Sequence, residues 1–433
     1  EFNTQQSTTK KEQTRASHGA IIRTNTMLIE HKASILLYCI ILFVCNRPEQ
    51  SFTAMPSSPP IPAAAAAAAS SAPQFLYSNL AFSGSSSGSD SLPGQSPTSE
   101  GESLVTSCAR SKVECQDSSA TLNVEWFSKE EAAWPLLAYC HGVCESAETW
   151  TVQNLARMCR KNQWRLAVLE LEGHGLSSGT RSLCSSFPRV VSHVGLFCHH
   201  VATLAPKPKD DGPIPLVLAG SSMGGVAALY AAAAMAKSLS INDNGSDAAL
   251  AGFAGCALIC PAVGVAPEVV PPPPIVMALS ALAWVAPSVG LMTPVEDPSI
   301  YACPHTSTRN FVGQWPLATS KMLLDVTSKT VQQDLAAYEQ AKAKATDGSQ
   351  HRSTPLDGMA MIPSMLVLAG EKDHVVPMTS IEDVIQKIDL PQDRKILCTI
   401  KKGDHYLLVK GKPMEEGISQ LAAWLEGRFA REN

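Results

Sequence analysis

The stretch PLVLAGSSMGGVAALYAAAAMA, residues 215–236, decides the fold of this chain. Its first apolar run predicts a short buried strand, and its alanine-rich second half predicts a helix. Between them lies G-x-S-x-G with Ser222 at its centre, which is typical of a nucleophile elbow. Gly220 and Gly224 leave room where a Cβ would crowd the neighbouring strand and helix. A Gly/Ser loop without a chemical role is the alternative, but the flanking strand and helix favour the elbow.

Length and composition bound the class of protein. The 433 residues suffice for one large α/β domain with extra segments, and 45% are hydrophobic. With 34 Lys+Arg against 39 Asp+Glu, the net charge of -5 gives no electrostatic reason to expect a nucleic-acid partner. The 13 cysteines form no C-x-x-C pair, and those at Cys140, Cys256, Cys260 and Cys398 lie in apolar strand-like runs. They are interpreted as buried small hydrophobes, which favours a reducing compartment.

Residues 1–103 are predicted to be a leader outside the folded domain. The first residue is Glu, so we expect a fragment or upstream translated sequence, with Met27 or Met55 as the start. The 13-residue apolar run 33–45 is short for a spanning helix, which needs about 20 residues. It fits a signal or anchor segment if Met27 is the start, and untranslated or poorly ordered sequence is the alternative, so the compartment stays open between cytoplasmic, membrane-associated and secretory. Residues 47–103 are rich in Pro, Ala, Ser and Gly, which is typical of disorder.

Strands alternate with helices over the rest of the chain. This order predicts an α/β domain over 104–433 with a mostly parallel sheet covered on both faces. The rhythm breaks between 263 and 356, where we expect an inserted helical cap between core segments 104–262 and 357–433. The expected strands are 122–127, 136–140, 166–171, 216–219, 256–260, 365–369 and 395–400, and the expected helices are 149–162, 190–204 and 418–429, with one or two more in 317–341.

Two further residues complete a candidate catalytic set with Ser222. A serine hydroxyl needs a base to take its proton, and the base needs an orienting acid. Asp373 follows the strand 365–369 and His405 follows the strand 395–400, so both are expected at the sheet edge that carries the elbow. His374 is a rival base, but it adjoins the acid Asp373 and does not follow a strand of its own. Asp404 is a rival acid, but it adjoins His405 and cannot easily orient it. The alternative for these loop residues is a turn carboxylate and a surface histidine.

The oxyanion formed during attack needs two backbone N–H donors. One is expected from Met223, the residue after the nucleophile. The other is expected from the loop after the strand 136–140, at Val143.

Three motifs in order carry a resemblance to a known family. They are HGVCE at 141–145, LEGHGLSSG at 171–179 and GSSMGG at 220–225. Over about residues 116–430 the chain resembles the monoacylglycerol lipase and lysophospholipase-like α/β-hydrolases, above all plant-type members, among the serine aminopeptidase-like hydrolases. The resemblance implies an α/β-hydrolase fold with a helical cap and hydrolysis of a carboxylic ester, with monoacylglycerol or lysophospholipid as leading substrates. Polar insertions and the divergent cap leave the substrate less defined than the reaction.

Other functions remain as alternatives. The same residues could pass the acyl group to an alcohol, which would make a transferase, or the fold could serve as a catalytically silent binding protein. No metal or cofactor is expected: His193, His199 and His200 share a predicted helix without matching carboxylates, and His174 is expected to shape its Gly-flanked loop. The oligomeric state is not decided by the sequence.

The apolar segment 275–286, IVMALSALAWVA, is the notable element of the cap. A helix this apolar cannot leave all its faces in water, so burial between cap and core is the structural alternative. The functional hypothesis makes Leu282 and Trp284 substrate-binding residues of an acyl tunnel, or gives the helix a peripheral contact with a lipid surface.

Overall fold

The computed structural model describes residues 105–116, 119–128, 133–205, 212–241, 248–267, 270–292, 309–311, 313–346 and 353–429. The chain divides into two compact units, Glu1–Gly101 and Glu102–Asn433, and every described residue belongs to the second. The apolar run 33–45 and the segment 47–103 lie outside the described residues. Among the helices of the described ranges, none combines the length and the apolar character needed to cross a membrane.

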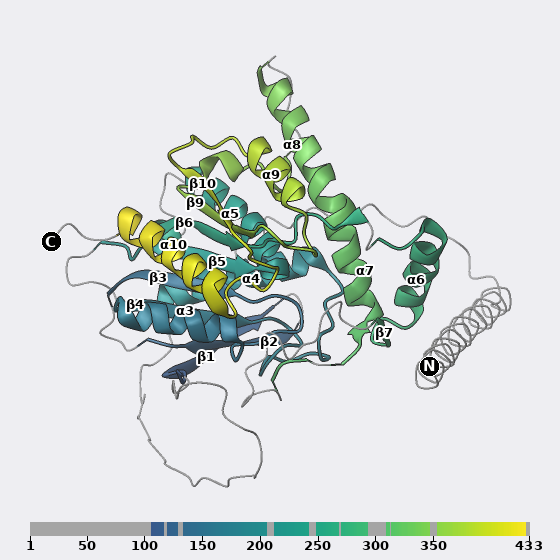
Figure 1. Cartoon of the computed structure of the whole chain (residues 1–433), viewed down its shortest axis with the longest axis horizontal. Helices are drawn as coiled ribbons and strands as arrows, with labels where there is room; N and C mark the ends of the chain where they lie inside the picture. The colour runs from purple at the N-terminus through teal and green to yellow at the C-terminus, as the bar shows by residue number, and fades with distance from the viewer. Residues whose placement is uncertain are drawn as a thin grey trace, which may run out of the picture. The chain divides into compact units, whose positions relative to one another are not determined.

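An eight-stranded sheet forms the centre of the second unit (Figure 1). Its strand order is β1-β2-β4-β3-β5-β6-β9-β10. β2 pairs antiparallel with β1 and β4, and the remaining pairs are parallel, so the predicted mostly parallel sheet is confirmed. The strands are β1 (Ala109–Cys115), β2 (Ala120–Trp126), β3 (Ala133–Cys140), β4 (Trp164–Glu170), β5 (Leu216–Ser221), β6 (Phe253–Ile259), β9 (Met365–Gly370) and β10 (Lys395–Ile400).

Helices cover both faces of the sheet. Alternate residues of a strand point to opposite faces, so on β5 Val217 packs with one apolar cluster and Leu218 with the other. The first cluster holds residues of α3 (Trp150–Lys161) and α10 (Gly411–Phe429). The second holds residues of α4 (Phe187–Leu204), α5 (Ser222–Ile241) and α9 (Met378–Lys387), and the short helices η2 (Leu250–Gly252) and η6 (Met359–Met361) adjoin it. All of β4 is buried, as expected for a strand between two helical layers.

Sequence analysis did not predict two elements of the core. The sheet begins with β1, one strand before the first one predicted, and α9 joins β9 to β10. β1 is an edge strand on which only Val113 and Cys115 are buried, so its sequence lacks a clear alternation of apolar and polar residues. Of the four cysteines predicted to be buried, Cys398 is partly exposed because it lies on the edge strand β10.

The cap lies between β6 and β9, as expected. It contains α6 (Pro273–Val285), the two-stranded β7 (Gly290–Met292) and β8 (Trp315–Pro316), α7 (Leu317–Asp325), the π-helical turn η5 (Val326–Thr330) and α8 (Val331–Thr346). In Figure 1, α7 and α8 run end to end. The Tyr230 hydroxyl donates to Asp334 Oδ2 (2.8 Å), which links the core helix α5 to the cap helix α8.

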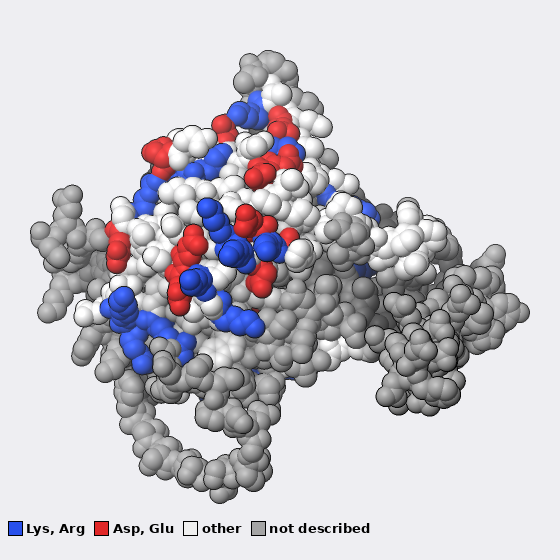
Figure 2. Space-filling model, viewed as in Figure 1, with Lys and Arg blue, Asp and Glu red and all other residues white. Residues whose placement is uncertain are grey.

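Charged side chains of both signs are mixed on the face shown in Figure 2. Acidic and basic groups lie side by side there, and this face carries no broad field of one sign.

Candidate active site

Ser222 stands at a sharp turn between β5 and α5. Its φ of 51° lies in the left-handed region, which a residue with a Cβ adopts only at a strained position. A Cβ on Gly220 would lie 2.3 Å from the Gly224 carbonyl oxygen, and one on Gly224 would lie 2.3 Å from the Cys140 carbonyl oxygen. Both glycines are therefore required by close backbone contacts, as the elbow motif predicts.

The structure brings the three predicted residues of the catalytic set together. His405 Nε2 lies 2.9 Å from Ser222 Oγ, and His405 Nδ1 lies 2.9 Å from Asp373 Oδ2. The Asp373 carboxylate accepts only, so Nδ1 carries the proton and Nε2 presents its lone pair to the serine hydroxyl. The arrangement can take a proton from the hydroxyl and return it to a leaving group. The rivals His374 and Asp404 are exposed.

Backbone amides hold the Asp373 carboxylate in its charged form. Asp373 Oδ1 accepts from Val375 N–H (2.9 Å) and Val376 N–H (2.8 Å). Burial acts to raise the pKa of Asp373, but the hydrogen bond and charge of His405 and these two amides outweigh it, so the pKa lies below its ordinary value. A charged acid at this place stabilises the imidazolium that forms when His405 takes the proton.

The loop after β3, residues 141–148, is called the oxyanion loop here. Gly142 N–H donates to Glu145 Oε2 (2.9 Å), and Cys144 N–H donates to His174 Nε2 (3.1 Å). Within the described part of the chain, Val143 N–H has no hydrogen-bond partner, so it is open to a ligand. Met223 is the second residue of α5, in the first turn of the helix, where backbone N–H groups have no partner within the helix. The predicted donors Val143 and Met223 thus remain the two candidates for an oxyanion hole.

Two buried histidines shape this loop. His174 Nδ1 donates to the Glu172 carbonyl (2.9 Å), which leaves Nε2 as the acceptor of the Cys144 amide. His141 Nδ1 likewise donates to the Gly142 carbonyl (2.7 Å), and its Nε2 accepts from Leu171 N–H (3.3 Å). Burial lowers the pKa of His141 to about 3 and that of His174 to about 4, so both rings are neutral and can accept. The sequence interpretation of His174 as a loop-shaping residue agrees with these contacts.

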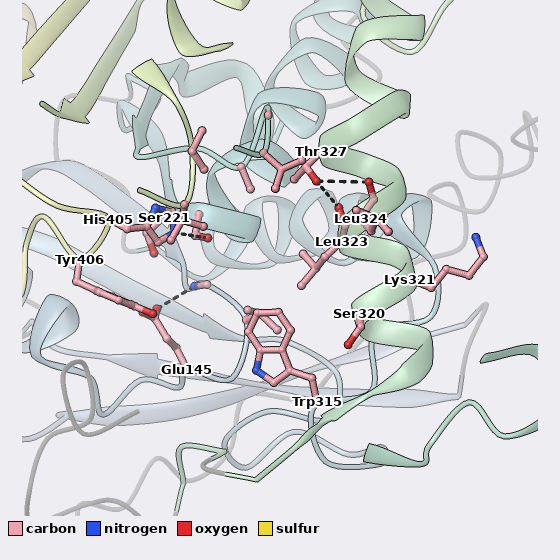
Figure 3. Close-up of a pocket in the computed structure, with 18 of the residues that line it drawn as sticks. Glu145, Ser221, Trp315, Ser320, Lys321, Leu323, Leu324, Thr327, His405 and Tyr406 are labelled. Carbon is pink, nitrogen blue, oxygen red and sulfur yellow. Dashed lines mark hydrogen bonds between the residues drawn. The ribbon is translucent and has the colours of Figure 1, made fainter. Parts of the chain in front are cut away.

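A cavity of about 190 Å³ opens over the catalytic set (Figure 3). Ser222, His405 and Glu145 lie at its core side, and Figure 3 shows Leu323 and Thr327 of the cap on the opposite side. Its lining is mainly apolar, with Val143, Val265, Val276, Leu279, Leu317, Leu324, Val375 and Leu407 among its members. Such a wall suits a hydrocarbon chain.

The structure corrects the expected substrate-binding pair on the cap helix. Val276, Leu279 and Ser280 of α6 line the cavity, whereas Leu282 and Trp284 do not. The lining positions follow the helical spacing i, i+3, i+4. Trp284 lies on another side of α6, where its side chain is 72% exposed. The sequence could not select the face, because apolar residues surround this helix.

Glu145 is a residue of the cavity that sequence analysis did not identify as functional. It is buried, and burial raises the pKa of its carboxyl to about 7, against the hydrogen bond from Gly142 and the charge of His405. Its position three residues after Gly142, inside the motif HGVCE, was the available signal.

Protonation of Glu145 should make stability depend on pH. Its pKa is about 7 in the folded state and near 4.5 when unfolded, so between these values the native state holds a proton that the unfolded chain has released. The contribution of Glu145 to the free energy of unfolding should therefore fall by up to about 3 kcal/mol as pH rises through this window. It is measured as the difference between wild type and Glu145→Gln, because the lowered pKa values of His141 and His174 act with the opposite sign. In Glu145→Gln this fall should vanish, measured by urea unfolding at pH 5 and pH 8. The exposed Glu415 supplies the control Glu415→Gln, and an equal pH effect in wild type and Glu145→Gln would contradict the assignment.

Cys260 lies beside the catalytic set. Its thiol, the Asp373 carboxylate and the His405 imidazole place one ligand atom each within 4.8 Å of one another. A metal ion held there would have to replace the Asp373–His405 hydrogen bond. In the present contacts His405 faces Ser222 as its base and Asp373 orients His405, so neither residue is a free ligand.

Comparisons with known proteins point in the same direction. The model of the family described as serine aminopeptidase, S33 matches residues 133–410. Among solved structures, a soluble variant of monoglyceride lipase from Saccharomyces cerevisiae, in complex with a substrate analogue, is similar with a TM-score of 0.54 and 14% identity, covering 76% of this chain and 98% of that one. The DcsB complex with its substrate analogue is similar with a TM-score of 0.50 and 12% identity, covering 74% and 99%. No protein with a curated description matches the chain. These structures support the fold.

Proposed function

Since the chain belongs to the serine aminopeptidase S33 family of α/β-hydrolases, we propose that it cleaves carboxylic esters of lipids, with monoacylglycerol as the leading substrate. The observation that carries the proposal is the relay Ser222–His405–Asp373 at the floor of an apolar cavity. The relay supplies an activated nucleophile, and the cavity supplies a place for an acyl chain.

The proposed reaction has two steps. Ser222 Oγ attacks the ester carbonyl while His405 Nε2 takes its proton, and the N–H groups of Val143 and Met223 stabilise the oxyanion. His405 then returns the proton to the departing alcohol, which leaves an acyl group on Ser222. Water enters, gives its proton to His405 and cleaves the acyl-enzyme by the same route. No cofactor takes part in this proposal.

Charge in the cavity favours a neutral alcohol over a phosphate headgroup. Lys321 is the only Lys or Arg among the cavity-lining residues in the described ranges, and it forms an ion pair with Asp325. Glu145 places a carboxyl in the same space. An anionic headgroup would find no free cation beside this carboxyl group, and above the carboxyl pKa of about 7 it would meet a second negative charge. The hydroxyls of glycerol can hydrogen bond to the carboxyl group in either protonation state. Monoacylglycerol is therefore preferred over lysophospholipid in this proposal.

A panel of lipid esters tests the proposal. Purified protein is given monoacylglycerol, lysophosphatidylcholine, lysophosphatidic acid and diacylglycerol of one acyl chain, each with and without excess glycerol as acceptor. We expect monoacylglycerol to give the highest kcat/KM and free fatty acid as the product. A preference for a lysophospholipid would overturn the headgroup argument, and acyl glycerol formed in place of fatty acid would identify a transferase. Failure of a fluorophosphonate to label the protein would identify a silent fold.

We further propose that α6 makes a peripheral contact with the lipid surface that holds the substrate. Its outer side carries exposed apolar side chains, with Met277 73% and Trp284 72% exposed and Ile275 and Val285 near one half. A row of this kind on a helix that also lines the substrate cavity suits insertion at the headgroup level. Such a contact would bring the cavity to its substrate.

Substitutions on the outer side and on the cavity side of α6 should have different effects on activity. Met277→Ser with Trp284→Ser should lower hydrolysis of monoacylglycerol in vesicles at least about 100-fold, because the lost burial amounts to about 1.5–3 kcal/mol for each of the two side chains. The same variant should leave hydrolysis of nitrophenyl butyrate unchanged. Leu279→Ser, on the cavity side, should lower hydrolysis of long-chain esters in vesicles and in detergent alike. Equal losses on all substrates, parallel to a lower melting temperature, would show that α6 is structural only.

A further inference from the structure

We propose that the cap segment 309–311, called the strap here, holds the oxyanion loop in its active position, with Arg309 as its positioning residue. The inference rests on the proposed function, because it assigns a role in the reaction of that site. Strap and loop lie far apart in the sequence, and three consecutive strap residues contact the loop. Contacts of this kind make the geometry of the oxyanion hole depend on the cap.

The contacts are successive along both segments. Phe311 N–H donates to the Cys144 carbonyl (2.9 Å), Ser146 Oγ donates to Asn310 Oδ1 (2.8 Å), and Arg309 Nε lies 3.2 Å from Glu148 Oε1. The strap and the oxyanion loop therefore run antiparallel, starting beside the candidate oxyanion donor Val143.

The backbone of Cys144 is held by hydrogen bonds on both sides of its Cα atom. Its N–H donates to His174 of the core, and its carbonyl accepts from Phe311 of the cap. Val143, the candidate oxyanion donor, directly precedes it. A shift of the strap would therefore move the Val143 amide, and a hydrogen bond to a developing charge depends steeply on its position.

Arg309 anchors the strap in a cluster of carboxylates. Its Nη1 lies 3.0 Å from Glu125 Oε1 and 3.9 Å from Glu170 Oε1, and its Nε reaches Glu148. Glu125 and Glu170 are 1% and 0% exposed, and the Asn123 amide donates to both. Arg110 Nε also lies 2.7 Å from Glu125 Oε1, so Arg309 is the second guanidinium beside Glu125 and the one that reaches Glu170. Buried carboxylates need such cations, and the loss of Arg309 would leave Glu170 without this partner.

Glu170 connects Arg309 to the oxyanion loop. Its Oε1 accepts from Ala147 N–H (3.0 Å) and its Oε2 accepts from Leu176 N–H (2.6 Å). A Cβ on Gly175 would lie 1.9 Å from this carboxyl group, so the backbone there is shaped around it. An ion pair thus joins Arg309 to Glu170, and charge-assisted hydrogen bonds join Glu170 to the oxyanion loop.

The experiment compares Arg309→Gln and Arg309→Lys with wild type on nitrophenyl butyrate. We expect Arg309→Gln to lower kcat on the order of 10-fold to 100-fold with KM nearly unchanged, since loss of a whole oxyanion donor costs about 100-fold to 1,000-fold. Arg309→Lys keeps the charge and should recover part of kcat. Tyr230→Phe is the matched control, because it removes a buried link between cap and core away from the loop, and it should leave kcat unchanged.

Two milder variants keep the test decisive if Arg309→Gln does not fold. Asn310→Ala and Ser146→Ala remove one hydrogen bond between strap and loop and no charge. Asn310→Ala removes the unpaired buried Nδ2 but leaves the Ser146 hydroxyl without its acceptor, whereas Ser146→Ala removes that hydroxyl, so the melting temperature of both variants is measured. Both variants should lower kcat at constant KM. The proposal would be overturned if kcat were unchanged in all strap variants. It would also be overturned if the strap variants lost no more kcat than Tyr230→Phe does at the same melting temperature.

The rate of fluorophosphonate labelling separates this proposal from the substrate assignment. The phosphonyl oxygen also occupies the oxyanion hole, so strap variants should label more slowly than wild type in proportion to their loss of kcat. If the wild-type protein reacts with the fluorophosphonate but hydrolyses no lipid ester, the proposed substrate class is wrong. The labelling rates of the strap variants would then still test the role of the strap. Equal labelling rates in wild type and strap variants would contradict the strap.

Discussion

Ser222→Ala is expected to lower turnover of a short-chain nitrophenyl ester on the order of a million-fold and to abolish fluorophosphonate labelling. The hydroxyl is the only group lost, and it is the group within 2.9 Å of His405 Nε2. The melting temperature should remain close to that of wild type, because alanine keeps the same Cβ at the strained φ of 51°. Activity and labelling are measured on the purified variant, and circular dichroism reports its fold.

Neighbouring serines provide the control for this prediction. Ser221 adjoins the nucleophile, but its hydroxyl is paired with the Tyr139 hydroxyl (2.8 Å), and Ser177 Oγ donates to the Glu170 carbonyl (2.5 Å). Neither contacts His405, so Ser221→Ala and Ser177→Ala should retain labelling. Labelling that persists in Ser222→Ala at either serine would move the nucleophile there.

The positions of the catalytic set could be predicted from the sequence for a geometric reason. Ser222, Asp373 and His405 each follow a parallel strand, and the carboxyl ends of parallel strands meet at one edge of the sheet. The order of the strands in the sheet therefore brings these three residues together although they lie far apart in the sequence. The glycines of the elbow add a local signal, because their backbone contacts exclude any side chain.

The cap could not be predicted to the same depth. The helix α6 is apolar all round, so periodicity did not tell Leu279, which faces the cavity, from Trp284, which does not. Arg309 lies in an irregular segment, and its partners Glu125 and Glu170 lie on separate strands, so only the tertiary fold joins them. Glutamates inside predicted strands were the available sign that a distant cation reaches them.

Asp373→Asn is expected to lower kcat about 10,000-fold while leaving the fold intact. The two oxygens of Asp373 have different partners, the amides of Val375 and Val376 on Oδ1 and His405 Nδ1 on Oδ2. Asparagine has one oxygen, and two backbone N–H groups require an acceptor there. The side-chain oxygen of asparagine must therefore face the amides, which turns its NH2 group toward His405.

That orientation would reverse the tautomer of His405. Facing a donor, Nδ1 must accept, so the ring proton moves to Nε2, which lies 2.9 Å from Ser222 Oγ and can no longer take its proton. We expect kcat to fall while KM changes little, with an unaltered melting temperature. Asp404→Asn is the matched control, because Asp404 is exposed and adjoins His405, and its side chain accepts from Tyr406 N–H (3.0 Å). Asparagine can also accept this hydrogen bond, so the substitution should leave kcat unchanged. Full activity in Asp373→Asn together with inactivity in Asp404→Asn would transfer the orienting role to Asp404, because only the acid that fixes the proton on Nδ1 makes Nε2 a base.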